Sequence, residues 1–172
     1  MNISMLLQGR VARAAAIASA TLALTVSGNA AGATTSSKLQ HHGRLSNGTV
    51  YAYALQNQNT GRCVDDSFAY GLRAFGCNGL NYQRFNYYSQ PDGSWVLQNQ
   101  NTGRCVDDSF AYGLRAFGCN GLNYQKWRII YQSDGSASYQ NENTGRVIDD
   151  SSAYGLRAFG YNGLSYQRFY FR

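Results

Sequence analysis

Histidine is nearly absent from this 172-residue sequence, and its two copies, His41 and His42, are adjacent near the N-terminus. Nucleophilic catalysis of the Ser/His or Cys/His type uses a histidine as its base, so most of the chain cannot supply such a site. The sequence also has no CxxC pair, the usual start of a cysteine zinc site. We therefore predict a protein that is not an enzyme and that holds no metal or cofactor.

Long hydrophobic runs are also missing, apart from one near the N-terminus between Ala14 and Val26. Arg10 and Arg13 precede this run and Ala31-Gly32-Ala33 follows it, a pattern typical of a secretory signal peptide. The run is short for a membrane span, although a signal anchor that stays attached is the alternative. We predict a signal peptide at 1–33, cleavage near Ala33, and a secreted, extracellular protein without a membrane span.

Charged residues are scarce, at 14% of the sequence, with 15 Lys and Arg against 9 Asp and Glu. Without Arg10 and Arg13, thirteen basic residues face nine acidic ones, for a net charge of about +4. The arginines are spread along the chain rather than clustered. This distribution favours a solvated surface over a nucleic-acid interface, and we predict no nucleic-acid partner.

Most of the sequence consists of one segment repeated at a period of 42 residues. The string RCVDDSFAYGLRAFGCNGLNYQ occurs at 62–83 and again at 104–125, and RVIDDSSAYGLRAFGYNGLSYQ follows at 146–167. One such unit buries little surface alone, so the three must share a core. We expect a flexible arm at 34–44 and one domain at 45–172, with repeats at about 45–90, 91–132 and 133–172.

Within each repeat the pattern is that of β-structure. Apolar and polar residues alternate in TVYAYALQN, GSWVLQN and YQKWRIIY, and helix signals are absent from the repeats. Asn47-Gly48, Asp92-Gly93 and Asp134-Gly135 are turn pairs before the first strand of each unit. We expect about four strands per repeat, about twelve in all, closed on themselves with pseudo-threefold symmetry so that no sheet edge is left free.

The four cysteines are spaced as two pairs, each fourteen residues apart, and the third repeat has Val147 and Tyr161 at the matching positions. Loss of both members together is expected for a pair bonded within one repeat. We predict the disulfides Cys63–Cys77 and Cys105–Cys119, in keeping with an exported protein.

These repeats resemble those of ricin B-type lectins, the QxW-repeat β-trefoil carbohydrate-binding modules. The resemblance rests on the elements Cys-x-Asp, aromatic-x-Cys and Gln-x-aromatic, the last of which reads Gln83-Arg84-Phe85 in the first repeat. It implies an all-β β-trefoil fold and carbohydrate as the partner. It assigns the sugar pockets to Asp65, Arg73, Phe75, Tyr82 and Gln83; Asp107, Arg115, Phe117, Tyr124 and Gln125; and Asp149, Arg157, Phe159, Tyr166 and Gln167.

In the family's pattern the aspartate binds the sugar, the aromatic residue forms a stacking platform, and the glutamine supports the aspartate. This chain departs from the pattern at Arg73 and Tyr82 and their equivalents, where Gln and Asn are usual. Because arginine pairs well with carboxylate or phosphate, these departures favour a sugar other than galactose or xylose, such as an acidic one. Tyr70, Tyr112 and Tyr154 are candidates for a second wall of each pocket.

Structural roles remain open for several of these residues. Phe75 and its equivalents could be core instead of platform, and Arg73 could serve only to neutralise Asp65 across a strand pair. We expect Asp66, Asp108 and Asp150 to hold turns through local hydrogen bonds. Phe85, Trp127 and Phe169 are predicted to be core. Adjacent aspartates point to opposite faces of a strand, which argues against a glycosidase carboxylate pair.

Together these features predict a secreted, non-catalytic lectin, multivalent through up to three equivalent pockets. It could act alone or as the targeting subunit of a separate toxin or hydrolase chain. Two alternatives remain open. One is a protein-binding β-trefoil, such as a protease inhibitor or an adaptor, and the other is a polyanion binder, suggested by arginines beside aromatic residues.

Overall fold

A computed structural model describes residues 50–172, so the predicted signal peptide and arm lie outside the described residues. These residues form thirteen short strands and three single-turn 3-10 helices. In chain order the elements are β1 (Val50–Tyr53), β2 (Leu55–Asn57), β3 (Cys63–Ser67), β4 (Gly71–Phe75), η1 (Asn81–Gln83), β5 (Phe85–Ser89), β6 (Trp95–Asn99), β7 (Cys105–Ser109), β8 (Gly113–Phe117), η2 (Asn123–Gln125), β9 (Trp127–Tyr131), β10 (Ala137–Asn141), β11 (Val147–Ser151), β12 (Gly155–Phe159), η3 (Ser165–Gln167) and β13 (Phe169–Phe171).

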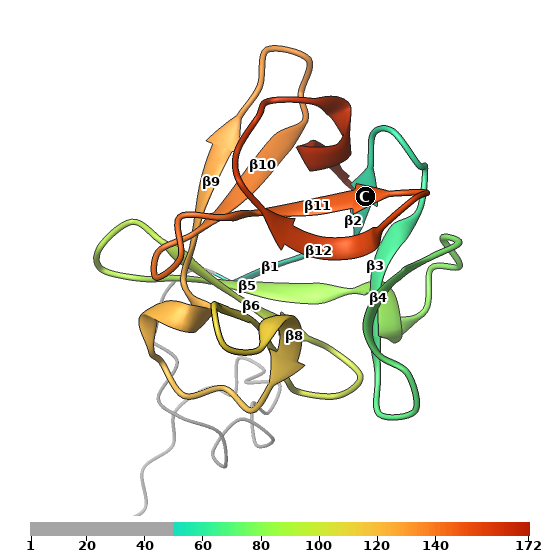
Figure 1. Ribbon diagram of the computed structural model, residues 1–172. Coiled ribbons are helices and arrows are strands. Elements are labelled where there is room, and N and C mark those ends of the chain that lie inside the picture. The colour runs from blue at the N-terminus through green and yellow to red at the C-terminus, as the bar shows by residue number, and fades with distance from the viewer. Residues whose placement is uncertain (1–49) are drawn as a thin grey trace, which may run out of the picture. The chain divides into compact units, whose positions relative to one another are not determined.

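One set of strands closes into a barrel. The strand β1 pairs with β5, and the circuit continues through β6, β9, β10 and β13 back to β2, with every pairing antiparallel. The strands β1 and β2 are consecutive in the chain and are separated only by Ala54. This interruption gives thirteen strands instead of the twelve expected. Ala54 bonds Arg172 through its backbone N–H at 2.8 Å and its carbonyl at 3.0 Å. The C-terminus therefore lies beside β2 (Figure 1).

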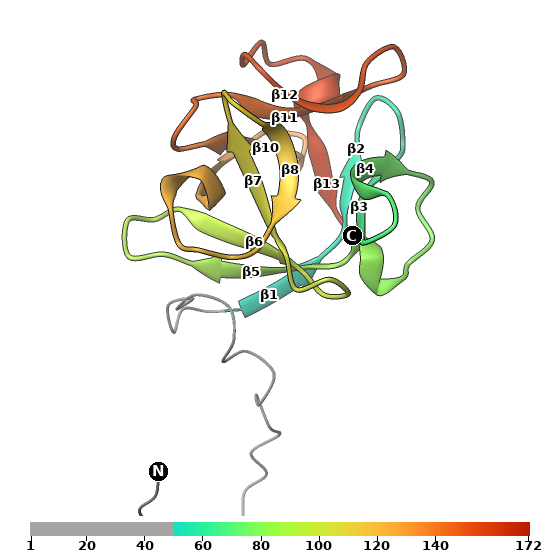
Figure 2. The same ribbon diagram turned by 60° about the horizontal axis from the view of Figure 1, so that its bottom comes forward.

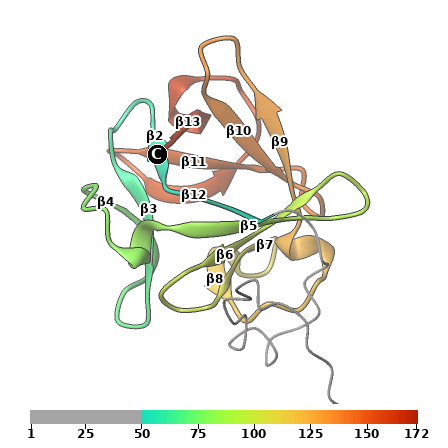
Figure 3. The ribbon, with the colours of Figure 1, turned by 180° about the vertical axis from the view of Figure 1, so that it is seen from behind.

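The other strands form three hairpins, β3–β4, β7–β8 and β11–β12. The strands β4, β8 and β12 contact one another, which brings the three hairpins together (Figure 2). Seen from behind, the β5–β6 and β9–β10 hairpins of the barrel end in projecting loops (Figure 3). A closed barrel with three such hairpins is a β-trefoil, as the sequence predicted.

The core combines aromatic and aliphatic side chains from all three repeats. Phe85, Trp127 and Phe169, predicted as core, are all buried, and Trp127 donates its indole N–H to the carbonyl of Val106 at 3.0 Å. The turn pairs Asp92-Gly93 and Asp134-Gly135 also lie where predicted, between paired barrel strands, whereas Asn47-Gly48 lies outside the described residues. Gly93 and Gly135 both have φ of 81°, a left-handed conformation that favours glycine.

Three arginine–aspartate pairs join the repeats. Arg104, just before β7 in repeat 2, donates from Nη2 to Asp66 Oδ1 of repeat 1 at 2.5 Å and from Nε to Oδ2 at 3.2 Å. Its Nη2 also bonds the carbonyl of Ser67 at 2.9 Å, and the hydroxyl of Thr102 donates to the same aspartate. The side chain of Asp66 is fully buried, so this charge depends on partners from another repeat.

The same arrangement recurs around the molecule. Arg146 pairs with Asp108 at 2.6 Å and Arg62 pairs with Asp150 at 2.5 Å, which links the first repeat to the last. We call these three pairs the inter-repeat clamp. The expectation that Asp66, Asp108 and Asp150 hold local turns is wrong, because their partners lie 36 or more residues away in sequence. Sequence spacing gave no sign of these distant arginines.

Two tyrosine hydroxyls meet inside the barrel. Tyr87 and Tyr139 share a hydrogen bond of 3.2 Å, and both rings are buried. Burial is the largest cause that raises the pKa of each phenol above its ordinary value of 10.0. The folded protein therefore holds these protons more tightly than the unfolded chain does.

The contribution of this pair to the free energy of unfolding should have its full value below pH 10 and should be lost as the pH rises above that value. We expect the free energy of unfolding to fall steeply between about pH 10 and pH 12. The variant Y139F keeps the ring and removes one phenol, so its free energy of unfolding should fall less steeply over this range. Urea unfolding at a series of pH values measures both slopes. Equal slopes would show that the buried pair does not control alkaline unfolding.

Candidate functional site

The outer face of each hairpin carries the residues that the sequence assigned to a pocket. In the register of β3 with β4, Asp65 lies opposite Arg73 and Cys63 lies opposite Phe75. Successive side chains of a strand point to opposite faces, so Asp65 and Arg73 share the outer face while Val64 faces the core. The hairpin register thus places the carboxylate of Asp65 beside the guanidinium of Arg73.

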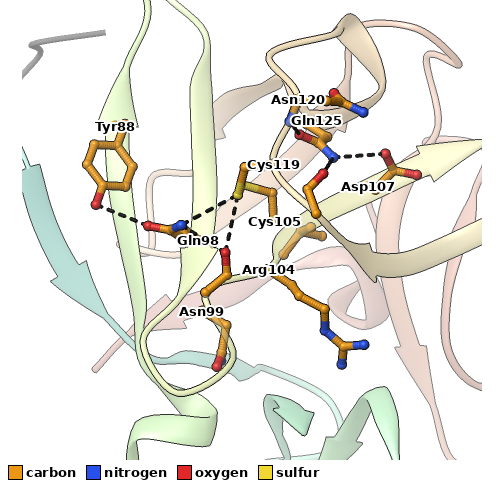
Figure 4. The surroundings of a disulfide bond; sticks show 12 residues. Tyr88, Gln98, Asn99, Arg104, Cys105, Asp107, Cys119, Asn120 and Gln125 are labelled. Atoms are coloured by element: carbon orange, nitrogen blue, oxygen red, sulfur yellow. Dashed lines mark hydrogen bonds between the residues drawn. A yellow bond between two sulfur atoms is a disulfide. The ribbon is translucent and has the colours of Figure 1, made fainter. Parts of the chain in front are cut away.

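Asp65 is held on two sides. Arg73 donates from Nε to its Oδ1 at 3.2 Å, and Gln83 donates from Nε2 to its Oδ2 at 3.3 Å. Gln83 also donates to the carbonyl of Gly76 at 2.9 Å and accepts from the backbone of Asn78 at 2.8 Å. The buried Gln83 therefore fixes both the carboxylate and the turn behind it. Figure 4 shows the equivalent contacts of Gln125 with Asp107 and Asn120.

Two aromatic rings flank Arg73. Its Cζ lies 4.3 Å from the centroid of the Tyr70 ring and 4.5 Å from that of the Phe75 ring. Both distances are within the range of cation–π attraction. Phe75 is 47% exposed, so its alternative as a core residue is wrong. The alternative that Arg73 neutralises Asp65 across the strand pair agrees with the observed ion pair.

The arrangement repeats with little change in the other two units. Arg115 pairs with Asp107 at 3.0 Å and Arg157 pairs with Asp149 at 3.1 Å. Each arginine also lies within 4.4 Å of two ring centroids, from Tyr112 and Phe117 and from Tyr154 and Phe159. Gln125 and Gln167 both donate to their aspartates at 3.2 Å. The third unit keeps this geometry although it lacks the disulfide.

In the first unit a cavity of about 480 Å³ opens beside the Asp65–Arg73 pair. This volume suits a small ligand, and its walls combine apolar surface with a few polar groups. Besides the predicted Asp65, Arg73, Tyr70 and Tyr82, the lining comprises Ser67, Phe68, Ala69, Asn78, Leu80 and Asn101. Gln83 lies behind the cavity as a support, and Phe75 contacts the arginine without lining the cavity.

The third unit has a smaller cavity, of about 240 Å³, lined by Asp149, Arg157, Tyr154 and Tyr166 among others. Phe68, which forms one wall of the first cavity, corresponds to Ser152 in this repeat. The loss of that ring removes one wall and agrees with the smaller volume. Leu80 and Leu164, which line the two cavities, were not predicted as site residues. The sequence did contain a signal for these two leucines, because each directly follows an Asn-Gly turn that returns the chain to the hairpin.

Figure 4 also shows the disulfide of the second unit. Cys105 bonds Cys119, as Cys63 bonds Cys77, so both predicted pairings are confirmed. Gln98 donates to Cys119 Sγ at 3.6 Å and accepts from the hydroxyl of Tyr88 at 3.2 Å. The cystine thus joins the hairpin site to the barrel strands β5 and β6.

A larger cavity, of about 520 Å³, lies at the barrel and is lined by Tyr51, Tyr53, Tyr87, Trp95, Ile129, Tyr131 and Phe171. Its walls carry no charged side chain, and the residues at matching positions differ between repeats. Tyr53, for example, corresponds to Trp95 and then to Ala137. Because this cavity has no charged side chain and its lining does not recur, the hairpin cavities are the better candidates for a functional site.

Residues 50–172 contain no helix that is long and apolar enough to cross a membrane. The same residues contain no cluster of three or more His, Cys, Asp or Glu arranged to hold a metal ion.

Several solved structures have a similar fold. ThreeFoil, a designed protein with threefold symmetry, is 19% identical with a TM-score of 0.62, and the match covers 70% of this chain and 96% of that protein. The hemolytic lectin CEL-III is 22% identical with a TM-score of 0.60, over 71% of this chain and 30% of the lectin. The cytolethal distending toxin of Haemophilus ducreyi is 17% identical with a TM-score of 0.60, over 70% and 81%. At these identities the similarity establishes the fold.

No curated protein sequence matches the chain. The sequence profile of the ricin-type β-trefoil lectin domain matches residues 51–169, which includes all three hairpin sites and nearly the whole barrel. The profile, the closed barrel with three hairpins and the Asp–Gln support in each unit agree with the resemblance seen in the sequence. The protein therefore belongs to the ricin-type β-trefoil lectin family, a family of non-catalytic carbohydrate-binding modules.

Proposed function

We propose that this protein is a secreted, non-catalytic lectin that binds carbohydrate through its three hairpin pockets. The observation that carries the proposal is the recurrence of one set of contacts in all three units. In each unit an aspartate is held by an arginine and a glutamine, and two aromatic rings flank the arginine. The side chains of Tyr70, Tyr112 and Tyr154 are about 70% exposed, so a ligand can reach them in each unit.

The chemistry of the cavity suits a sugar. A pyranose has an apolar face of C–H groups and a rim of hydroxyls. Tyr70, Tyr82 and Leu80 supply apolar wall, and the side-chain amides of Asn78 and Asn101 can donate to and accept from hydroxyls. A single pocket of this kind should bind weakly, with a Kd near 1 mM, or about 4 kcal/mol.

Three pockets on one rigid body support multivalent binding. When a polymer or a glycan-rich surface engages two or three sites, the later contacts are intramolecular, and avidity can exceed the single-site affinity by about 10²- to 10⁴-fold. The clamp between repeats holds the three hairpins at fixed relative positions, which reduces the ordering that each further contact requires.

The proposal includes export and a targeting role. The two disulfides are compatible with an oxidising compartment, and the N-terminal sequence has the pattern of a signal peptide. This chain spans 16% of a mosquitocidal holotoxin and 30% of the hemolytic lectin, so the same fold forms one part of larger proteins. By extension, we propose that this lectin carries a separate toxin or hydrolase chain to a glycan surface.

The test is the triple variant Y70A/Y112A/Y154A, which removes one wall from each pocket. These tyrosines are about 70% exposed, so their removal should leave the fold intact. On a glycan and polysaccharide array, we expect the apparent affinity for the best ligand to drop by about 100-fold or more, because avidity multiplies the loss at each site.

The matched control is Y131A, which removes an equally exposed tyrosine from the barrel cavity. It should bind as the unchanged protein does. A triple variant that binds with full affinity would reject the hairpin pockets, and no binding of any glycan by the unchanged protein would favour a protein partner.

A further inference from the structure

We propose that the hairpin pockets select sugars that carry an anionic oxygen group, a carboxylate or a sulfate, and that Arg73, Arg115 and Arg157 recognise it. This inference rests on the carbohydrate-binding function proposed above and specifies the class of sugar. It concerns the same three pockets and assigns the specificity to the arginine rather than to the aspartate.

The aspartate is poorly placed to hold a neutral sugar. Asp65 is only 3% exposed, and both of its carboxylate oxygens already accept a hydrogen bond, one from Arg73 and one from Gln83. Each oxygen keeps one further lone pair, but the burial of Asp65 leaves a ligand hydroxyl little access to it. We infer that Asp65 is a positioning residue, which holds the guanidinium of Arg73 in place by its Nε edge.

The arginine, in contrast, presents free donors to the cavity. Within residues 50–172, the hydrogen bonds of Arg73, Arg115 and Arg157 come from Nε alone. The side chain of Arg73 is 33% exposed and lines the cavity. A guanidinium has four further N–H groups on its two Nη atoms, arranged as a planar fork. That fork matches the two oxygens of a carboxylate or of a sulfate.

The guanidinium is also fixed before a ligand arrives. The ion pair holds one edge, and the rings of Tyr70 and Phe75 lie against it at 4.3 Å and 4.5 Å. A preorganised fork loses little side-chain freedom on binding, which raises its selectivity for a ligand of matching geometry. Tyr70 contacts the arginine and also lines the cavity, so the apolar face of the sugar can meet Tyr70 as well as Tyr82 and Leu80.

Other arginines of the molecule are arranged differently. The arginines of the inter-repeat clamp donate hydrogen bonds from both Nε and Nη2 to a buried aspartate and a backbone carbonyl; they are Arg62, Arg104 and Arg146. Arg128 is 66% exposed and pairs with Glu142 on the barrel surface. The pocket arginines combine a held Nε edge with free Nη donors in each unit, and in the first and third units they also line a cavity.

The experiment compares matched pairs of glycans that differ only in one acidic group. We would use lactose with and without a terminal sialic acid, glucuronic acid against glucose, and galactose 6-sulfate against galactose. Titration calorimetry should show the acidic member of at least one pair bound about 10- to 100-fold more tightly. The sialic acid and glucuronic acid pairs test recognition of a carboxylate, and the galactose 6-sulfate pair tests recognition of a sulfate.

Two triple variants test whether the preference for acidic sugars comes from the planar guanidinium of the pocket arginines. In R73Q/R115Q/R157Q, glutamine takes the arginine positions, and we expect the acidic preference to disappear while binding of neutral sugars stays or rises. In R73K/R115K/R157K, the charge and the partner of Asp65 remain but the planar fork is lost, so the preference should fall without loss of the fold. The control R84Q/R128Q/R172Q removes three charges outside these pockets and should keep the preference.

Each outcome bears on a different claim. Equal binding of acidic and neutral sugars by the unchanged protein would overturn the acidic class while the lectin function stands. No binding of any sugar would overturn both. Binding of heparin and of DNA alike, reduced as much by the control variant as by R73Q/R115Q/R157Q and abolished at 0.3 M salt, would instead indicate a general polyanion surface.

Discussion

Replacing Arg146 with methionine should lower the free energy of unfolding by about 3 to 5 kcal/mol, as expected when a buried ion pair loses one partner. Asp108, which Arg146 contacts through two of its nitrogens, has a fully buried side chain. Methionine fills much of the same volume but donates no hydrogen bond, so the carboxylate would remain buried without its counter-charge. Urea unfolding followed by circular dichroism measures the change.

The pair Arg128–Glu142, in which the arginine side chain is 66% exposed and the glutamate side chain 12% exposed, provides the control for this variant. It is also an arginine–carboxylate contact, at 2.9 Å, but the arginine is largely in solvent. The variant R128M should therefore cost about 0 to 1 kcal/mol. If R146M and R128M lowered the free energy of unfolding equally, the clamp would not stabilise the molecule beyond an ordinary surface contact. R62M tests the pair that joins the first repeat to the last, and we expect a similar cost.

Removing the second disulfide with C105A/C119A should lower the free energy of unfolding by about 3 kcal/mol, because its loop of about 15 residues becomes free in the unfolded chain. Both sulfurs are buried, and Cys119 lies in a small cluster with Tyr88 and Val96, so some packing is also lost. Chemical unfolding of the variant, compared with the unchanged protein with and without reducing agent, gives the size of the effect.

The third repeat offers the reciprocal experiment. Val147 and Tyr161 occupy the positions of the missing cystine, and Val147 pairs with Phe159 in the same register as Cys63 with Phe75. The variant V147C/Y161C should form a third disulfide and raise the free energy of unfolding by about 2 to 3 kcal/mol. Thiol titration shows whether the bond has formed. A bond that forms without any gain in stability would contradict the expected effect of loop closure.

A large part of the molecule follows from the sequence because its cues are local and repeated. The period of 42 residues indicated three equivalent units, and alternation of apolar and polar residues indicated strands. The joint loss at Val147 and Tyr161 indicated the cysteine pairing. Each cue depends on residues close together in the chain, so no knowledge of the packing was needed.

The site was predicted in part. The pairing of Asp65 with Arg73 follows from two neighbouring strands of one hairpin, so it could be foreseen as an alternative. The roles within the pocket could not, because they depend on which atoms are already bonded. Only the structure shows that Gln83 and Arg73 occupy both oxygens of Asp65 and that Phe75 contacts the arginine instead of lining the cavity.

The sequence by itself thus determined the strands, the closure of three units and the cysteine partners, since hydrophobic period and repeat spacing are properties of the chain. Tertiary structure alone decided the inter-repeat clamp, in which Arg104 reaches Asp66 at a separation of 38 residues, and which atoms of the pocket residues are already bonded. The physical reason is that a buried charge needs a partner wherever the fold can bring one, and sequence distance does not limit that choice.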